Sequence, residues 1–169
     1  MKAVIYVLAG IMLSSALAVS CGQQAPGPTS PGRTRYPPEL EDSEVAYLDK
    51  MNGLADMISN SVGPSGVSIL WDASILWDDE HKASFAAEAA TRRAVVEELR
   101  ELEPTPRYTE FHRLIVEGFE EHVAADDIEA WAIDTLDPSL LDQALERRKT
   151  ADQKLREALD LLERLEGEQ

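Results

Sequence analysis

The sequence predicts an all-α fold, an up-and-down antiparallel bundle of about four helices over residues 39–169. Apolar residues recur there at helical spacing, and charged residues and helix formers fill the positions between them. Prolines separate the helical segments and leave only short connections, which place consecutive helices antiparallel. The chain has a single cysteine, so helix packing holds the fold without an internal disulfide.

The first two helices are each marked by one apolar stripe. The first stripe repeats at i, i+3, i+7, i+10 and i+14, and consists of Leu48, Met51, Ala55, Ile58 and Val62. The turn Gly63-Pro64-Ser65-Gly66 then ends this helix. The second helix is expected to begin near Asp78, which opens a run of acids suited to capping and to the positive end of a helix dipole, and to stop at Pro104. Its stripe comprises Phe85, Ala89, Val96, Leu99 and Leu102.

The third and fourth helices both begin with a capping residue followed by proline. Thr105 and Pro106 are the expected N-cap and first residue of the third helix, and Asp137 and Pro138 repeat this pattern for the fourth. The third helix carries one line of Phe111, Ile115, Gly118, His122 and Ala125, with Val116, Phe119 and Val123 beside it. The inward stripe of the fourth helix is expected at Leu141, Leu145, Leu155, Leu159, Leu162 and Leu165.

The stretch 67–77 between the first two helices contains a short repeat. The run Ser68-Ile69-Leu70-Trp71-Asp72 recurs as Ser74-Ile75-Leu76-Trp77-Asp78. A shift of six residues turns a helix by about 600°, so the two copies would face different directions on one helix. Trp71 and Trp77 therefore fit either a plug over the end of the bundle or a partner patch, because tryptophan is enriched at binding hot spots.

The N-terminus has the layout of an export signal. Residues 3–19 are uncharged and mostly apolar, and they follow a single basic residue, Lys2. They end in Leu17-Ala18-Val19-Ser20-Cys21, which resembles a bacterial lipobox with alanine at a position where leucine is commonest. The resemblance implies that Cys21 receives diacylglycerol and that the chain is cut before it, which removes residues 1–20. An uncleaved anchor helix and plain secretion are the alternatives.

The segment from Gly22 to Pro38 has the composition of a tether. It contains five prolines, no acidic residue and no periodicity, so it cannot bury enough apolar surface to fold. Residues 21–38 are therefore expected to be a lipidated cysteine with a disordered, Pro-rich tether. The whole chain has 16 basic and 32 acidic residues, a net charge of -16. Such a surface repels phosphate backbones, so nucleic acid is excluded as a partner.

The chain offers few metal-ligating residues. Di-metal sites in helical bundles use Glu-x-x-His pairs, and this sequence has none, which disfavours a ferritin-like centre. No metal site is expected, and the candidate that remains is His122 with Asp126, an i, i+4 pair that could chelate one ion together with Glu121 or Glu129. A histidine near a carboxylate arises by chance among 32 acids, so a packed core histidine or a surface ion pair is the competing interpretation.

No cofactor and no catalytic group is expected. Methionines on the first helix and histidines on the third could hold haem, but methionine at helical spacing is typical of a core, and Cys-x-x-Cys-His is absent. The sequence has no Gly-x-Ser-x-Gly elbow and no free thiol once Cys21 is lipidated. Arg148 and Asp152, spaced i, i+4 on the fourth helix, are expected to pair with each other at the edge of the core.

These residues favour a membrane-anchored bacterial envelope lipoprotein, held through lipid on Cys21 at the extracytoplasmic side of the cell membrane. In its patterning and in the prolines between its helices, the chain is similar to small helical-bundle lipoproteins of bacterial envelopes that lack an assigned activity. The expected function is non-enzymatic: a scaffold, or a module that binds an envelope protein. A metal-ion or small-ligand binding module within the bundle is the alternative.

Overall fold

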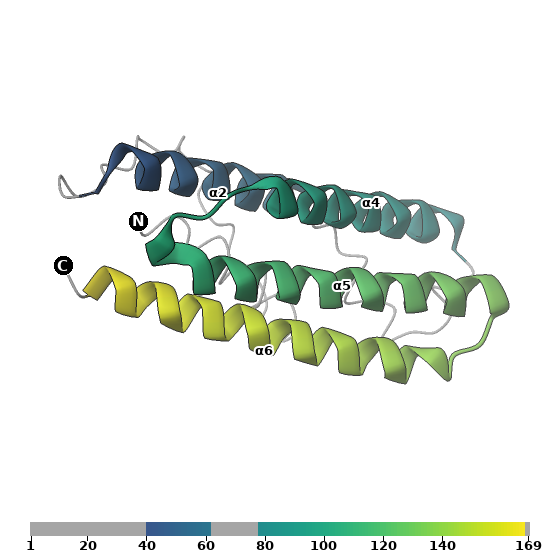
Figure 1. The fold of residues 1–169 in the computed structure, drawn as a ribbon. Helices are drawn as coiled ribbons and strands as arrows, with labels where there is room; N and C mark the ends of the chain where they lie inside the picture. Colours follow the sequence, from purple (N-terminus) through teal and green to yellow (C-terminus); the bar gives the residue numbers. More distant parts are fainter. Residues whose placement is uncertain (1–39, 62–77, 168–169) are drawn as a thin grey trace, which may run out of the picture.

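The computed structural model describes residues 40–61 and 78–167, and within them the predicted all-α bundle is confirmed. The elements follow in the order α2 (Asp42–Ser61), α4 (Asp79–Glu101), the 3-10 turn η2 (Pro106–Tyr108), α5 (Thr109–Thr135) and α6 (Leu140–Gly167). Consecutive helices run antiparallel, with α5 between α4 and α6 in Figure 1. The two described ranges contain no strand, and no helix in them is long and apolar enough to cross a membrane.

Several predicted features lie outside the described residues. They are the export signal, Cys21, the Pro-rich tether, Val62, and the stretch that contains Trp71 and Trp77.

The predicted caps are present at two of the three helix starts. Asp78 caps α4, because its Oδ1 accepts a hydrogen bond from the amide of Glu80 at 2.9 Å. Asp137 likewise accepts from the amide of Ser139 at 2.9 Å and from its hydroxyl at 2.6 Å, just before α6. The prediction for Thr105 was wrong in detail. Its backbone occupies the N-cap position, but its buried hydroxyl makes no capping bond, and a 3-10 turn precedes α5.

Most described members of the apolar stripes predicted for the first three helices are buried, whereas Leu102, Val116 and Val123 are only partly buried. The buried members include Leu48, Met51, Ala55 and Ile58 on α2, Phe85, Ala89, Val96 and Leu99 on α4, and Phe111, Ile115 and Phe119 on α5. Tyr47 adds a contact outside the predicted stripe. Its ring stacks on Tyr108 with centroids 5.5 Å apart, and its hydroxyl lies in hydrogen-bond contact with Nδ1 of His112 at 3.3 Å. These contacts hold α2 against η2 and the start of α5.

Helices α5 and α6 pack closely through small residues in heptad spacing. The buried small residues are Gly118, Ala125 and Ala132 on α5, and Ala144, Ala151 and Ala158 on α6. A Cβ added to Gly118 would lie 2.8 Å from Cγ and Cδ2 of Leu155, so glycine permits this close approach. The inward stripe of α6 therefore centres on its alanines with Leu155 and Leu162. The other leucines predicted for it are only partly buried: Leu141, Leu145, Leu159 and Leu165.

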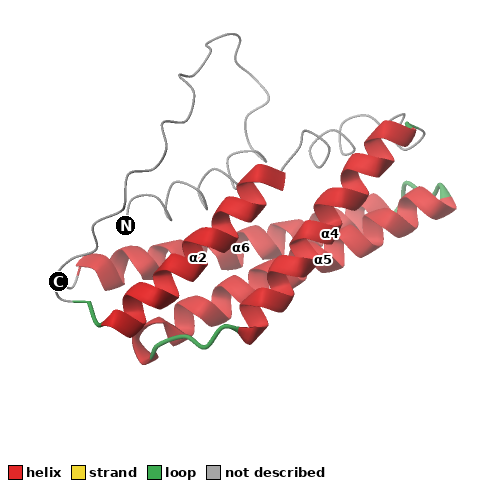
Figure 2. Cartoon of the chain, turned by 90° about the horizontal axis from the view of Figure 1, so that it is seen from above, coloured by secondary structure: helices red, strands yellow, loops and turns green. Residues whose placement is uncertain are grey.

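The apolar core is divided into two clusters. The larger one contains residues of all four helices and lies at the end where α2 begins and α6 ends. The smaller one joins Phe85 to Ala130, Ile133 and Leu141, near the turn between α5 and α6. Figure 2 shows α2 alongside α4, and α5 and α6 continue beyond the C-terminal end of α2. On α4, α5 and α6 the residues between the two clusters include charged side chains, and these form the candidate site.

Candidate functional site

A layer of charged side chains crosses the bundle between the two apolar clusters. Helix α4 contributes Glu88 and Arg92, α5 contributes Asp126 and Glu129, and α6 contributes Arg148. Asp126 is 0% exposed and Glu129 is 1% exposed. Both continue the inward line of α5, because positions spaced i, i+4 and i+7 share one helix face. We call these five residues the charged layer.

Two bidentate contacts hold the charged layer together. Arg92 donates to Asp126 from Nε at 2.6 Å and from Nη2 at 2.9 Å. Arg148 donates to Glu129 from Nε and from Nη2, both at 2.7 Å, and its Nη2 also donates to Asp126 at 2.9 Å. Glu88 makes a longer contact, 3.9 Å from Nη1 of Arg92. Asp126 therefore bridges α4 and α6, and both of its oxygens accept from arginine.

The ionisation of the charged layer follows from these contacts. Burial alone would lower the pKa of Arg148, but its hydrogen bond to Glu129 and the charges of Glu129 and Asp126 raise the pKa above the usual arginine value. Arg148 is therefore charged inside the bundle. Burying ions is expensive, so a buried ion pair is weak evidence for stability. We infer that the layer fixes the register of α4, α5 and α6.

His122 lies on the same face of α5, one turn before the charged layer, and it has no hydrogen bond. Both ring nitrogens are buried without a partner, and Nε2 lies 3.7 Å from Oδ1 of Asp152 on α6, which is too far for a hydrogen bond. Burial, with the charges of Arg148 and Arg92, lowers the pKa of His122 to about 3, so its ring is neutral at physiological pH. Burial raises the pKa of Asp152, and Arg156 and Arg148 act against that rise.

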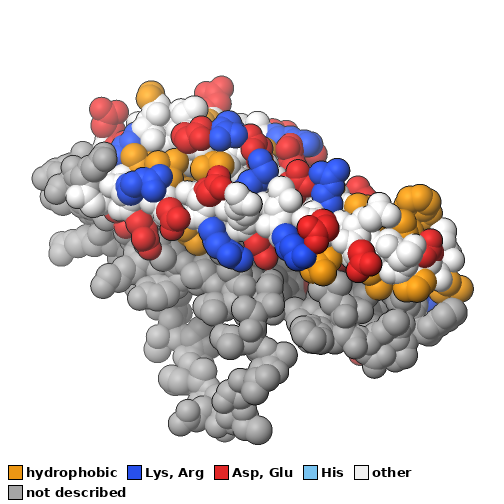
Figure 3. Space-filling view, turned by 90° about the horizontal axis from the view of Figure 1, so that it is seen from below, with side chains coloured by type: hydrophobic (Ala, Val, Ile, Leu, Met, Phe, Trp, Pro, Cys, Tyr) orange, Lys and Arg blue, Asp and Glu red, His pale blue; other side chains and the backbone are white. Residues whose placement is uncertain are grey.

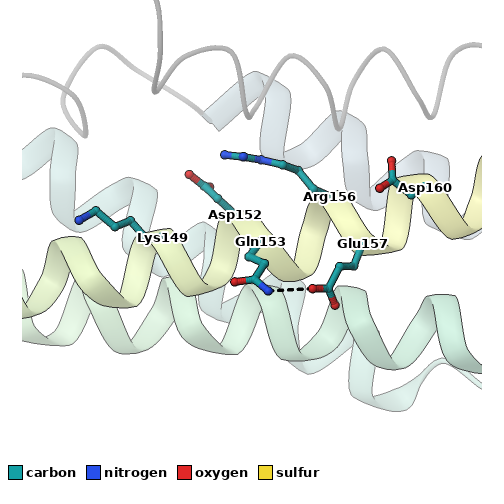
Figure 4. Close-up of a pocket in the computed structure, with 6 residues that line it drawn as sticks. All are labelled: Lys149, Asp152, Gln153, Arg156, Glu157 and Asp160. Atoms are coloured by element: carbon teal, nitrogen blue, oxygen red, sulfur yellow. Dashed lines mark hydrogen bonds between the residues drawn. The ribbon is translucent and has the colours of Figure 1, made fainter.

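Asp152 also lines a shallow groove of about 370 Å³ on α6. The lining residues share one stripe of the helix: Lys149, Asp152, Gln153, Arg156, Glu157 and Asp160. Figure 4 shows Asp152 and Arg156 projecting from the same side of α6. The amide of Gln153 donates to Glu157 at 2.9 Å. An open helix face of mixed charge is typical of a solvated surface, and Asp152 connects this one to His122.

The structure gives the two members of the predicted metal pair different partners. His122 and Asp126 share a face of α5, but the carboxylate of Asp126 is occupied by two arginines while His122 lies beside Asp152. The predicted pairing of Arg148 with Asp152 was wrong, because Arg148 reaches across to the two buried carboxylates of α5 instead. Across residues 40–61 and 78–167, no group of three His, Cys, Asp or Glu side chains could hold a metal ion.

Sequence reasoning missed the contribution of α4 to this site. Arg92 and Glu88 interrupt the stripe that runs from Phe85 to Val96, so a charged residue falls where the helical repeat calls for an apolar one. A matching interruption occurs on α5 at Asp126. Interruptions of opposite charge in two apolar stripes are a signal that each helix buries a charged residue, but they do not identify the partner of either residue.

The surface differs between the two ends of the bundle. Figure 3 shows acidic and basic side chains interspersed over much of one face, and hydrophobic side chains gathered toward the end where α5 meets α6. The large apolar side chains that the structure describes as exposed are Met57, Trp131 and Leu136. Trp131 and Leu136 both belong to that end.

The fold and the site define an acidic, antiparallel helical bundle with a buried arginine–carboxylate layer. No protein-family model, curated protein or solved structure matches the chain.

Proposed function

We propose that the protein is a lipid-anchored lipoprotein of the bacterial envelope whose bundle is a non-enzymatic scaffold that binds a protein partner. The observation that carries the proposal is the position of the single cysteine. Cys21 directly follows an uncharged apolar stretch and the small residues of Leu17-Ala18-Val19-Ser20. One acyl chain holds a protein only marginally, whereas the two chains of a diacylglyceryl cysteine give stable anchoring.

The tether and the charge of the chain support the same proposal. Residues 22–38 could span roughly 50 Å when extended as polyproline helix, and they carry no acidic residue. The net charge of -16 is repelled by the anionic lipids of a membrane surface. The lipid thus keeps the bundle near the membrane, while the tether and the repulsion keep its surface clear for a partner.

The charged layer supports a scaffold. Bidentate contacts from Arg92 and Arg148 join α4, α5 and α6 at one level of the bundle. A surface presented on helices that are fixed relative to one another loses little conformational entropy when it binds a partner. Because its two arginines donate to Asp126 and Glu129 within the layer, the layer joins the helices to one another.

The anchor is tested by labelling cells with an alkynyl fatty acid and isolating the protein. We expect label on the wild-type chain and partition into a detergent phase, and both are expected to be lost in Cys21→Ser. Because Cys21 is the only cysteine, this variant removes every thiol. Equal label in Cys21→Ser, or an unlabelled wild-type protein, would contradict the anchor. Partner binding is tested separately by cross-linking in intact cells, with Trp71→Ala and Trp77→Ala as variants of the patch expected from the sequence.

A second candidate function, a metal-ion or small-ligand binding module, rests on His122. Its ring nitrogens have no hydrogen-bond partner, and Asp152 lies 3.7 Å away at the edge of the groove on α6. The two neighbouring guanidinium groups, which lower the pKa of His122, also oppose a bound cation. The geometry therefore supports this candidate less well than the scaffold, and metal titration distinguishes the two.

A further inference from the structure

The C-terminal turn of α5 combines three features that are unfavourable for an isolated helix end. Trp131 is 57% exposed and Leu136 is 47% exposed. Leu136 has φ 56° and ψ 36°, the left-handed conformation in which glycine or asparagine is the low-cost residue. Asp134 is exposed in a last turn without a basic residue, where the partial charge of the helix end is already negative. The amide of Leu136 caps the helix by donating to the carbonyl of Ala132, but the exposed apolar side chains and the charge of Asp134 remain unfavourable.

The apolar surface extends from this turn across the seam between α4 and α5. Arg93 pairs with Asp127 across the seam. Three residues flank the same seam between Arg93 and the turn that joins α5 to α6. On α4, Ala90 and Ala86 precede Arg93 by three and seven residues. On α5, which runs in the opposite direction, Trp131 lies four residues after Asp127. Both alanines are exposed. We call Ala86, Ala90, Trp131 and Leu136 the Trp131 patch.

Acidic side chains border the Trp131 patch. Asp134 lies on α5 one turn beyond Trp131, and Asp79 and Glu80 are exposed in the first turn of α4 at the same end of the bundle. Lys82 on α4 pairs with Asp79 at 3.2 Å and offsets its charge, so the net negative charge of the rim comes from Asp134 and Glu80. The patch is therefore apolar at its centre and negative at its rim, which suits a partner with the opposite arrangement of charge.

We propose that the Trp131 patch docks a cationic amphipathic segment of a protein partner, with lysine or arginine beside apolar side chains. Such a segment offsets the apolar exposure and the negative charge, while the backbone of Leu136 keeps its left-handed conformation. Its apolar side chains cover Trp131 and Leu136, and its cations meet Asp134 and the terminal carbonyls of α5. The inference rests on the proposed function and specifies its partner. In Figure 1 this end of the bundle lies opposite the end at which α2 begins.

The docking is tested with the full-length protein in phosphatidylcholine nanodiscs and a labelled helical peptide with leucine on one face and lysine on the other. Fluorescence anisotropy is expected to show saturable binding above that of empty nanodiscs. Trp131→Ala should weaken it by about tenfold, as at other aromatic hot spots. Leu136→Asn keeps a residue suited to the left-handed turn and should also weaken binding. Asp134→Asn should flatten the dependence on salt.

Matched controls separate this surface from general attraction to an acidic protein. Met57→Ala removes an apolar side chain on α2 that is 45% exposed, and it should leave the affinity unchanged. A lysine–serine peptide of equal charge should bind more weakly. Equal affinity for that peptide, or unchanged binding in Trp131→Ala with Leu136→Asn, would overturn the assignment. If this double variant still cross-links to a partner in cells, the proposed function stands and this surface is rejected; if the wild type cross-links to none, the proposed function fails.

Discussion

Replacing the buried carboxylate of Asp126 tests whether the charged layer holds the bundle. Asp126→Asn keeps the shape of the side chain but removes the charge shared by Arg92 and Arg148. Breaking a buried ion pair by changing one partner costs about 3–5 kcal/mol, because the other charge is left uncompensated. Arg148 retains its bidentate contact with Glu129, so we expect the lower figure, about 3 kcal/mol. Arg92 loses its bidentate carboxylate and keeps the longer, 3.9 Å contact with Glu88.

The adjacent ion pair on the same two helices is the matched control. Arg93 and Asp127 join α4 to α5 one residue further along each helix, but their side chains are 47% and 61% exposed. Exposed pairs contribute about 0–1 kcal/mol, so Asp127→Asn should cost less than about 0.5 kcal/mol after screening by solvent. The same substitution type at consecutive positions thus isolates the effect of burial.

The measurement is urea unfolding followed by helical circular dichroism, with the slope of the transition checked for constancy. The double variant Asp126→Leu with Arg92→Met removes both charges. Its loss of stability should be smaller, by at least about 2 kcal/mol, than the summed losses of the single variants Asp126→Leu and Arg92→Met. Equal costs for Asp126→Asn and Asp127→Asn would refute the reasoning. Additive effects in the double variant would do the same.

Three further predictions concern packing, pH and metal ions. Gly118→Ala places a Cβ 2.8 Å from Leu155 and should destabilise the fold by about 1–3 kcal/mol. As a control, the Cβ added by Gly53→Ala meets nothing within 4 Å. This variant should stabilise α2 by about 0.5–1 kcal/mol in the same urea assay. The pKa of His122 is 6.5 before folding and about 3 after it, so its contribution to stability is full above pH 6.5 and is lost as pH falls. The free energy of unfolding should therefore drop by about 2 kcal/mol from pH 7 to pH 5. The variant His122→Gln should remove most of this decline. A smaller part should remain from His112, whose pKa is also lowered by burial. Calorimetric titration with Zn²⁺ or Mn²⁺ should show no saturable heat that depends on His122; such a heat, absent in His122→Gln, would favour the ligand-binding alternative.

The sequence by itself determined the helices and most of their inward faces. Spacing of apolar residues is a local property that each helix expresses wherever it packs, so the stripe of α2 and the line from Phe111 to Ala125 were predictable. Caps such as Asp78 and Asp137 were predictable for the same reason, because a side-chain oxygen satisfies an amide two residues away. Leucine outweighed alanine in the prediction for α6, although heptad spacing already marked Ala144, Ala151 and Ala158.

Only the tertiary structure decided which charges meet. Arg148 has Asp152 one turn away on its own helix, but it bonds to Glu129 and Asp126 on α5 because buried carboxylates gain most from a bidentate cation. The partner of Arg92 is 34 positions away in the chain, a distance that no local pattern encodes. The exposure of Trp131 likewise depends on which face of α5 the neighbouring helices cover. The proposed docking surface therefore follows from the packing of the helices and not from their sequence alone.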